Sequence, residues 1–458
     1  MIRLFNVYVP TRLLLLVVTE PVIIFASFSL AVIFCIGRDA FIVLGYQYGL
    51  YKIIAITALT IVGFDLFDLY DVNLSSFLEE SHSRLLVVLG LVCCFLAGLG
   101  YVFPHLLLGK RSLLVGVVIV TFALSGWRVF YAWLVRQPYF RERVYLLGAG
   151  EWADEIVKVL RTRHELGMEL VGWLGATGGE LGSNGSLGQT LLSAVQKSRA
   201  RRVIVAIRDR RNRMPTRELL QLSLNGIKVE DAAAIYQRVT GKIDVDMLLP
   251  SSLIFGEGFR LNPAFLFARR VISIIASAAL FVFLSPLIPF IVIAINLTSP
   301  GPVLYRQRRV GLKGKIFTVL KFRTMRCDAE SSTGPTWAQK DDPRITRVGR
   351  LLRNTRLDEI PQLWNVFRGD MEFVGPRPER PEFEELLVRE IPYYNIRHVV
   401  RPGITGWAQV CYEYGASIEE AREKLKYDIY YIKNMGLGFD LFIILRSLKV
   451  VLLGWGAR

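Results

Sequence analysis

The chain has 458 residues and a formal net charge of +16, from 56 Lys and Arg against 40 Asp and Glu. Its mean hydropathy is nevertheless positive, at +0.37. Soluble proteins rarely combine the two, whereas a membrane protein with basic cytoplasmic faces does so. Such a charge also suits partners that carry phosphate, including nucleic acid and anionic lipid. The length makes two or three domains the expectation.

Cysteine usage argues against two further classes of protein. The chain has five cysteines, none in a CxxC spacing: Cys35, Cys93, Cys94, Cys327 and Cys411. Neither a disulfide framework nor a zinc site is therefore expected.

Four long apolar stretches occupy the N-terminal third, at roughly 13–36, 46–67, 85–108 and 112–134. Each reaches the ~20 residues that a spanning helix needs, so residues 1–140 are predicted to form a bundle of four transmembrane helices. The first stretch carries Glu20 and Pro21 and no small-residue cleavage site follows it. We therefore favour a retained segment over a removed leader.

Four crossings return the chain to its starting side of the membrane. Basic residues gather on that side, at Arg3, Arg12, Arg136, Arg141 and Arg143. Positive charge marks cytoplasmic loops, so this side is predicted to be the cytoplasm.

Residues 141–260 have the pattern of a Rossmann-like α/β domain. The strand-like runs VYLLGAG, MELVGWL, RVIVAI and IKVED alternate with helical segments at 151–163, 189–199 and 215–224. This βαβ order predicts a parallel sheet. The first turn, Gly148 to Ala153, is close to the G-x-G-x-x-G/A pattern that brings backbone N–H groups against a pyrophosphate. The acidic residue expected after the second strand is missing, so a structural or regulatory domain is the alternative to nucleotide binding.

The next segment is apolar from Val271 to Leu297 and is long enough to cross a bilayer. Ser285-Pro286 and Pro289 stand at its centre, where proline bends a helix. Both flanks are basic, with Arg269 and Arg270 before the segment and Arg306, Arg308, Arg309, Lys313 and Lys315 after it. This charge places both ends on the cytoplasmic side. We therefore favour a re-entrant helix at 269–297, broken at Ser285 and Pro286, over a crossing helix.

Asp358 and Glu359 form the centre of a polar, basic region and are followed by Pro361. Proline is tolerated in the first turn of a helix, so a helix containing QLWNVF is predicted to start close to Asp358. Both carboxylates would then lie at its positive end and stay ionised near neutral pH. One could attack phosphorus while its neighbour positions a proton or a hard cation such as Mg2+. A bare acidic pair is more often a solvated helix start, so its surroundings decide.

Those surroundings are cationic: Lys321, Arg323, Arg344, Arg350, Arg353, Arg356, Arg368 and Arg377. A phosphoryl-transfer site needs positive groups that meet charge on the phosphate oxygens. We assign Lys321, Arg353 and Arg377 to the site first. The prolines on either side of Arg377 fix its backbone, although a plain turn would use the same residues. Basic residues beside the membrane also suit anionic lipid head groups.

The region from about 266 to 454 closely resembles the bacterial monotopic polyprenyl-phosphate phosphoglycosyl transferases. KFRTM, LDEIPQLWNV, GDMEFVGPRP and RPGITGWAQV recur there in this order. The resemblance implies a catalytic α+β domain, here 261–458, with a re-entrant helix broken at Ser285-Pro286. It also implies a catalytic dyad, here Asp358 and Glu359, that works with Mg2+. Phosphate or nucleotide contacts are implied for Lys321, Arg353 and Arg377, and we add Arg323, Gln362 and Asn365 as substrate-binding residues.

The resemblance further implies a reaction in two steps. The aspartate takes a sugar 1-phosphate from a UDP-sugar, releases UMP, and passes the group to polyprenyl (undecaprenyl) phosphate. Direct attack by the lipid phosphate, with the dyad only binding metal, is the mechanistic alternative. A catalytically inactive, membrane-anchored nucleotide-sensing regulator or scaffold is the alternative from another class.

The whole chain is similar to the large members that start exopolysaccharide or O-antigen synthesis. The expected location is the bacterial inner membrane with the catalytic domain on its cytoplasmic face. The expected partners are a UDP-sugar, polyprenyl phosphate and the lipid bilayer, with a homodimer also considered. Nucleic acid is not expected, because no aromatic and basic platform accompanies the charge.

Two further features concern the C-terminal part. The common family pattern continues Asn-Gly-Arg after TGWAQV, whereas this chain has Cys411-Tyr412-Glu413-Tyr414-Gly415. The usual arginine is therefore lost from that loop. The last apolar run, GFDLFIILRSLKVVLLGW, is predicted to form a helix that lies in the membrane interface or packs in the catalytic core.

Overall fold

A computed structural model describes most of residues 2–453, with its main gaps at 71–76, 104–107, 138–140, 176–184, 208–213, 247–261, 327–341 and 413–416. Cys327, Glu413 and Tyr414, which figure in the sequence analysis, lie outside the described residues. The chain forms two compact units. The first is Tyr8–Ile235 with Met1–Ile2, and the second is Tyr236–Arg458 with Arg3–Val7. The domain boundaries at 140 and 260 remain predictions.

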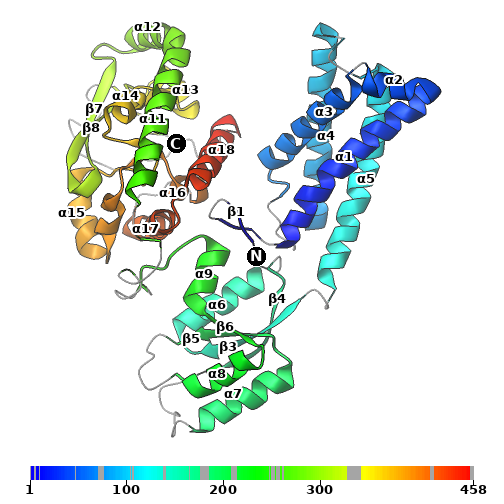
Figure 1. Cartoon of the computed structure of the whole chain (residues 1–458). Coiled ribbons are helices and arrows are strands. Elements are labelled where there is room, and N and C mark those ends of the chain that lie inside the picture. The colour runs from blue at the N-terminus through cyan, green and yellow to red at the C-terminus, as the bar shows by residue number, and fades with distance from the viewer. Residues whose placement is uncertain are drawn as a thin grey trace. The chain divides into compact units, whose positions relative to one another are not determined.

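The first unit begins with long apolar helices, drawn in blue and cyan in Figure 1. Their bounds are α1 (Thr11–Ile36), α2 (Ala40–Gly45), α3 (Gly49–Leu66), α4 (Phe77–Val102) and α5 (Lys110–Arg136). Both α1 and α4 contact α3 and α5. Four stretches here are long and apolar enough to cross a membrane, as is Pro263–Thr298 in the second unit. Helices of this length and composition are those of a membrane protein.

A buried ion pair joins α1 to α5. Arg128 Nε donates to Glu20 Oε1 at 2.8 Å, and neither side chain is exposed. The guanidinium also lies 5.5 Å from the ring centroid of Phe64 in α3. Charges inside an apolar bundle are stable only when they are paired, so this contact fixes the register of α1 against α5.

The α/β part of the first unit has a four-stranded parallel sheet, as the sequence predicts, in the order β4-β3-β5-β6. The strands are β3 (Glu142–Gly148), β4 (Met168–Leu174), β5 (Arg202–Ala206) and β6 (Lys228–Asp231). Figure 1 shows α6 (Glu151–Thr162) on one face and α7 (Gly185–Ser198) with α8 (Thr216–Leu224) on the other. Gly148 has a φ of 148°, and a Cβ there would lie 2.4 Å from the carbonyl oxygen of Ala206. The tight turn therefore needs glycine for packing as well, and nucleotide binding there remains a prediction.

The second unit is built around two short sheets. The antiparallel hairpin consists of β7 (Leu304–Val310) and β8 (Ile316–Phe322), and β9 (Glu372–Val374) pairs in parallel with β10 (Gly403–Thr405). Helix α9 (Ala232–Thr240) contains the boundary between the two units. The helices that follow it are α11 (Pro263–Leu284), α12 (Ile288–Thr298), α13 (Arg347–Asn354), α14 (Gln362–Arg368), α15 (Pro381–Glu390), α16 (Trp407–Cys411), α17 (Ile418–Lys433) and α18 (Leu437–Leu453).

The core of this unit gathers around Trp407, whose ring lies 5.2 Å from that of Phe439 and 6.4 Å from that of Tyr430. Helix α18 places Phe439 and Ile443 in this core and exposes Leu441 and four other large apolar residues, Leu437, Ile444, Leu445 and Leu448. It therefore packs in the catalytic core, one of the two positions that the sequence left open, and its location in the membrane interface stays a prediction.

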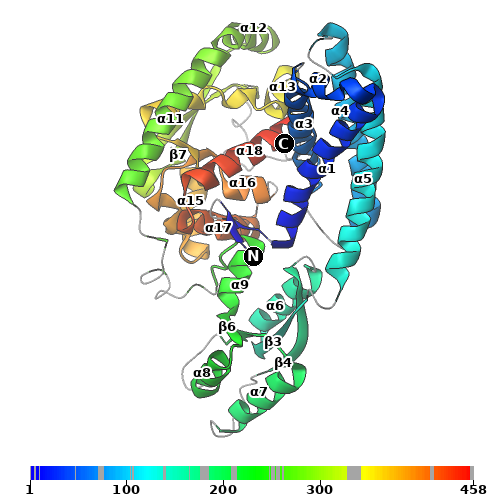
Figure 2. The same cartoon turned by 45° about the vertical axis from the view of Figure 1, so that its right-hand side comes forward.

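The long apolar helix of the second unit breaks at the predicted residues. Helix α11 ends at Leu284, one 3₁₀ turn covers Ser285–Leu287, and α12 leaves in a new direction, as Figure 1 and Figure 2 both show. Pro286 and Pro289 lack the N–H groups that would continue the helical ladder. Ser285 Oγ donates to Val282 O at 2.8 Å, which satisfies one of the freed carbonyl groups. That the segment re-enters the membrane stays a prediction.

Both parts of the broken helix have residues near the small helix α14, through a hydrogen bond for α11 and a shared apolar cluster for α12. Near the start of α11, Arg270 donates to Val366 O at 2.6 Å and to Phe367 O at 2.8 Å, both in α14. Ile291 and Ile295 of α12 share a buried cluster with Leu363, also in α14. The seven residues of α14 extend over only about 10 Å.

Candidate active site

The acidic pair lies in a 3₁₀ turn, η7 (Leu357–Glu359), immediately before α14. The helix begins at Gln362 rather than at Asp358, because Pro361 caps it and cannot donate a backbone hydrogen bond. Arg356 enters the turn with a φ of 58°, in the left-handed region. This entry turns the chain inward, so that both carboxylates are buried, with 7% of Asp358 and 8% of Glu359 exposed.

Glu359 is held by three cations. Lys321 Nζ from β8 lies 2.9 Å from its Oε1, and Arg377 Nη2 lies 3.3 Å from the same oxygen. Arg356 Nη1 approaches Oε2 at 3.7 Å. Burial alone would raise the pKa of Glu359, but these charges reverse the effect and hold it well below its ordinary value. Glu359 is therefore a fixed anion that organises the cations.

Asp358 differs from its neighbour. Among the described residues its carboxylate has no hydrogen-bond or ion-pair partner, although Lys321, Arg353 and Arg356 lie close enough to act on it electrostatically. Burial raises the pKa of Asp358, the charge of Lys321 opposes the rise, and the charge of Glu359 adds to it. A carboxylate that is buried, unbonded and close to cations is available to react with an anionic substrate.

The structure brings Lys321 and Arg377 to the acidic pair, as predicted. Burial lowers the pKa of the Lys321 ammonium, and the charge of Glu359 opposes this. Arg353 lies farther back on α13, where its Nε donates to Thr324 Oγ1 at 2.9 Å. The sequence analysis names Arg356 among the cations around the pair but does not place it in the site, although its spacing of three residues from Glu359 was a usable signal.

Three other predicted binding residues have different surroundings. Arg323 is buried and donates to Pro300 O at 2.8 Å and to Ser299 O at 2.5 Å, so it holds the end of α12. Asn365 is buried and bonds the backbone of β8 at two points. Gln362 is buried at the first position of α14, one turn from Asp358. Substrate contact by these three residues remains a prediction, and the structure gives Arg323 and Asn365 positioning contacts.

The donor set at the pair fits a hard divalent cation. The described residues contain no cluster of three or more His, Cys, Asp or Glu that could hold a metal alone. Magnesium, however, is commonly bound by one or two carboxylates together with substrate phosphate and water. No hydrogen-bond or ion-pair partner of the Asp358 oxygens is found in the described part of the chain, and they could serve as such ligands.

Long apolar helices and a buried acidic pair among lysine and arginine side chains define a membrane protein whose site is suited to an anionic substrate. The profile of the bacterial sugar transferase family matches residues 264–454, which contain this whole site. The chain belongs to the bacterial sugar transferase family.

Three relatives indicate the range of the similarity. The chain is 41% identical over 242 residues to a UDP-N-acetylgalactosamine-undecaprenyl-phosphate N-acetylgalactosaminephosphotransferase of Aeromonas hydrophila, covering 53% of this chain and 56% of the relative. It is 44% identical over 186 residues to a UDP-glucose:undecaprenyl-phosphate glucose-1-phosphate transferase of Caulobacter vibrioides, covering 40% and 69%. It is 40% identical over 181 residues to the exopolysaccharide production protein PSS of Rhizobium leguminosarum, covering 38% and 90%. The chain thus spans little more than half of the Aeromonas relative.

Proposed function

We propose that the chain transfers a sugar 1-phosphate from a UDP-sugar to polyprenyl phosphate through a covalent intermediate on Asp358. The two relatives named as transferases carry undecaprenyl phosphate and a UDP-linked sugar in their names, which supports both substrate classes. The Rhizobium relative's name supports a role in exopolysaccharide synthesis. The observation that carries the proposal is the contrast between the two carboxylates. No described residue bonds Asp358, whereas Lys321, Arg356 and Arg377 surround Glu359.

In the first step a carboxylate oxygen of Asp358 attacks the phosphorus that bears the sugar. A phosphorus–oxygen bond forms to Asp358, the bond to the second phosphate breaks, and UMP leaves with the electron pair. In the second step a phosphate oxygen of the lipid attacks the same phosphorus and frees the carboxylate. Each step needs positive charge around the phosphate oxygens, and Lys321 and Arg377 supply it.

Glu359 keeps those cations in place. Without a fixed anion, a lysine and an arginine would repel one another at this distance and turn toward solvent. With Asp358, Glu359 would also supply oxygen ligands to Mg2+. When bound, that ion neutralises charge on the diphosphate and on the leaving UMP.

The broken helix supports a site at one face of the bilayer. A helix that crosses a bilayer separates its ends by about 30 Å. Here Arg270 near the start of α11 bonds α14, and Ile291 and Ile295 of α12 lie in one buried cluster with Leu363 of α14, a helix that extends over only about 10 Å. We therefore propose that α11 and α12 enter and leave the membrane on the same face. The basic flanks favour the cytoplasmic face of the inner membrane. This brings a soluble UDP-sugar and a lipid-borne phosphate to one site.

Release of UMP before any lipid acceptor is added tests the covalent route. The wild-type chain, offered a panel of UDP-sugars without polyprenyl phosphate, should release about one UMP per active site with the correct sugar. Asp358→Asn should release none. Asp246→Asn, which alters a more exposed carboxylate paired with Arg422, should behave as wild type.

Each other outcome points to a different alternative. Normal UMP release by Asp358→Asn would refute the role of Asp358. Wild-type release only after polyprenyl phosphate is added would favour direct attack by the lipid. No release with any sugar, with or without the lipid, would favour an inactive regulator or scaffold.

A further inference from the structure

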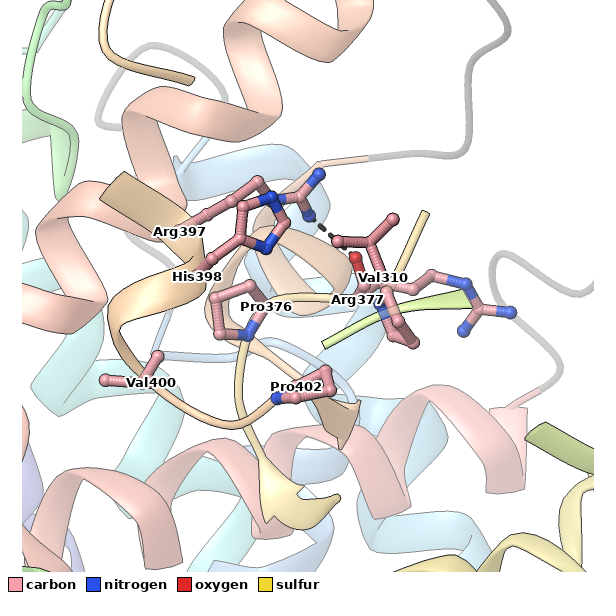
Figure 3. Close-up of a pocket in the computed structure, with 8 residues that line it drawn as sticks. Val310, Pro376, Arg377, Arg397, His398, Val400 and Pro402 are labelled. Carbon is pink, nitrogen blue, oxygen red and sulfur yellow. Dashed lines mark hydrogen bonds between the residues drawn. The ribbon is translucent and has the colours of Figure 1, made fainter. Parts of the chain in front are cut away.

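Arg377 lies in a turn, Gly375–Pro378, whose backbone accepts a hydrogen bond from another arginine. Arg397, in the 3₁₀ turn Tyr394–Val399, donates from Nη2 to the backbone carbonyl oxygen of Arg377 at 2.7 Å. Figure 3 shows this bond as a dashed line, with the guanidinium of Arg377 directed away from Arg397. The contact therefore holds the backbone of Arg377, while its side chain extends to Glu359.

Arg397 is itself held by a buried carboxylate. Its Nη2 lies 3.1 Å from Asp428 Oδ2 on α17, and the two side chains are 7% and 3% exposed. Its guanidinium also lies over the ring of Tyr394, 5.0 Å from the centroid. Its other terminal nitrogen, Nη1, donates to the Tyr394 hydroxyl. A planar guanidinium bonded through both terminal nitrogens has one orientation, so the position of its donor group is well defined.

Several contacts hold the Arg377 turn. A pocket lies against it, lined by Val310, Pro376, Pro378, His398, Val400 and Pro402 together with the two arginines. Pro376 and Pro378 stiffen the backbone on each side of Arg377, so the turn moves as one piece. Gly375 N donates to Thr405 O at 2.8 Å, Pro376 O accepts from Gly403 N at 3.0 Å, and Pro378 O accepts from Arg309 Nη1 at 2.8 Å. The bond from Arg397 is the one that reaches the carbonyl group of Arg377 itself.

We propose that Arg397, held by Asp428, is a positioning residue for Arg377 and so for phosphate binding at the acidic pair. Contacts run from Asp428 to Arg397, to the backbone of Arg377, and through its side chain to Glu359 at 3.3 Å. The inference rests on the proposed function, in which Arg377 meets substrate phosphate. The sequence does not reveal this chain of contacts, because Asp428 and Glu359 lie on separate elements.

The test is a double-mutant cycle on the full chain in detergent. Arg397→Lys keeps the charge beside Asp428 but loses the planar fork, and Arg377→Lys shortens the group that meets phosphate. Each variant should raise the KM for the UDP-sugar, measured by UMP release. The rise should reach up to about 100-fold if the cationic group that meets the phosphate moves by about 1 Å. Because both act through one group, the double variant should be no worse than Arg377→Lys alone. Asp428→Asn, which keeps the side-chain shape, should give the same rise in KM and serves if Arg397→Lys does not fold.

Arg401→Lys is the matched control. This guanidinium also donates to a backbone carbonyl, that of Gly369 at 3.0 Å, and faces Glu372 at 3.5 Å. It should lower thermal stability without raising KM. Effects of Arg397→Lys and Arg377→Lys that multiply in the double variant would overturn the proposal. So would a change in stability without a change in KM.

Equilibrium binding of UDP, measured by calorimetry, separates this inference from the proposed reaction. If the wild type binds UDP but releases no UMP from any UDP-sugar, the reaction fails, and weaker UDP binding by both single variants would still support positioning. If UMP is released normally and Arg397→Lys binds UDP as the wild type does, the reaction stands and the positioning role fails. If the wild type neither binds UDP nor releases UMP, both fail.

Discussion

Replacing Asn365 by leucine tests how β8 is held in the site. Asn365 is 2% exposed, and its side-chain amide bonds the backbone of β8, as a neighbouring strand would do in a larger sheet. Its Nδ2 donates to Thr318 O at 2.7 Å, and its Oδ1 accepts from Leu320 N at 3.0 Å. Lys321 is the next residue along β8, so these bonds set where its ammonium meets Glu359. Leucine fills a similar volume but offers neither bond.

The expected cost follows from the groups left without partners. A buried backbone group that loses its hydrogen bond costs about 1–3 kcal/mol. Thr318 is exposed, so water can reach its carbonyl, and the amide of Leu320 accounts for most of the loss. We therefore expect about 2 kcal/mol of local destabilisation, which corresponds to roughly 30-fold faster opening of β8.

Hydrogen–deuterium exchange on a peptide covering residues 316–322 measures this opening directly. Asn365→Leu should speed exchange of that peptide and reduce UMP release. Asn434→Leu is the control, because the Asn434 side chain donates to Tyr430 O at 2.9 Å in α17 and does not contact β8. It should leave the 316–322 peptide unchanged.

One result would refute this reasoning. If Asn365→Leu left the exchange of residues 316–322 unchanged but raised the KM for the UDP-sugar, Asn365 would contact substrate, as the sequence analysis expected. The positioning role that we derive from its two backbone bonds would then be wrong.

Three further predictions concern other parts of the chain. Burial raises the pKa of Asp428 to about 6 against the opposing charge of Arg397, with Glu379 raising it further and Lys424 and His398 lowering it. The folded-state pKa exceeds the ordinary 3.8, so the unfolded chain loses this proton at lower pH than the folded chain does. The wild type should therefore lose thermal stability relative to Asp428→Asn as pH rises from about 4 to about 6. Equal stability profiles against pH would contradict this. Replacing Pro286 and Pro289 by leucine should straighten the helix and separate its ends. Cysteines introduced at the two flanks of a cysteine-free chain should then be labelled from opposite sides of sealed vesicles. In the parent chain, which keeps both prolines, they should be labelled from one side. Chelation should stop UMP release and added Mg2+ should restore it, and full activity after chelation would remove the metal from the proposal.

The sequence predicts local features of this protein well. Apolar length marks the long helices, the βαβ order gives the parallel sheet, and prolines mark the break near Ser285. The acidic pair and two of its cations, Lys321 and Arg377, are also found from motif and charge. These features depend on residues near one another in the chain or on the physical demands of a phosphate site.

What the sequence does not give is how distant segments pair. An asparagine after an acidic pair suggests substrate binding as readily as a bond to β8, because the partner is a backbone group without a sequence signature. The pairing of Arg397 with Asp428 depends on how α17 packs against the 3₁₀ turn. A left-handed φ at Arg356 has no marker either, since glycine or asparagine is the usual residue there.

The ion pair between Glu20 and Arg128 also has a consequence for biosynthesis. The two residues are 108 positions apart, so a ribosome adding about 5–20 residues per second makes the arginine several seconds after the glutamate. During that interval a solitary ionised group facing acyl chains would cost about 3 kcal/mol. Helix α1 should therefore remain beside the translocation machinery until α5 emerges, and the two should move into lipid together.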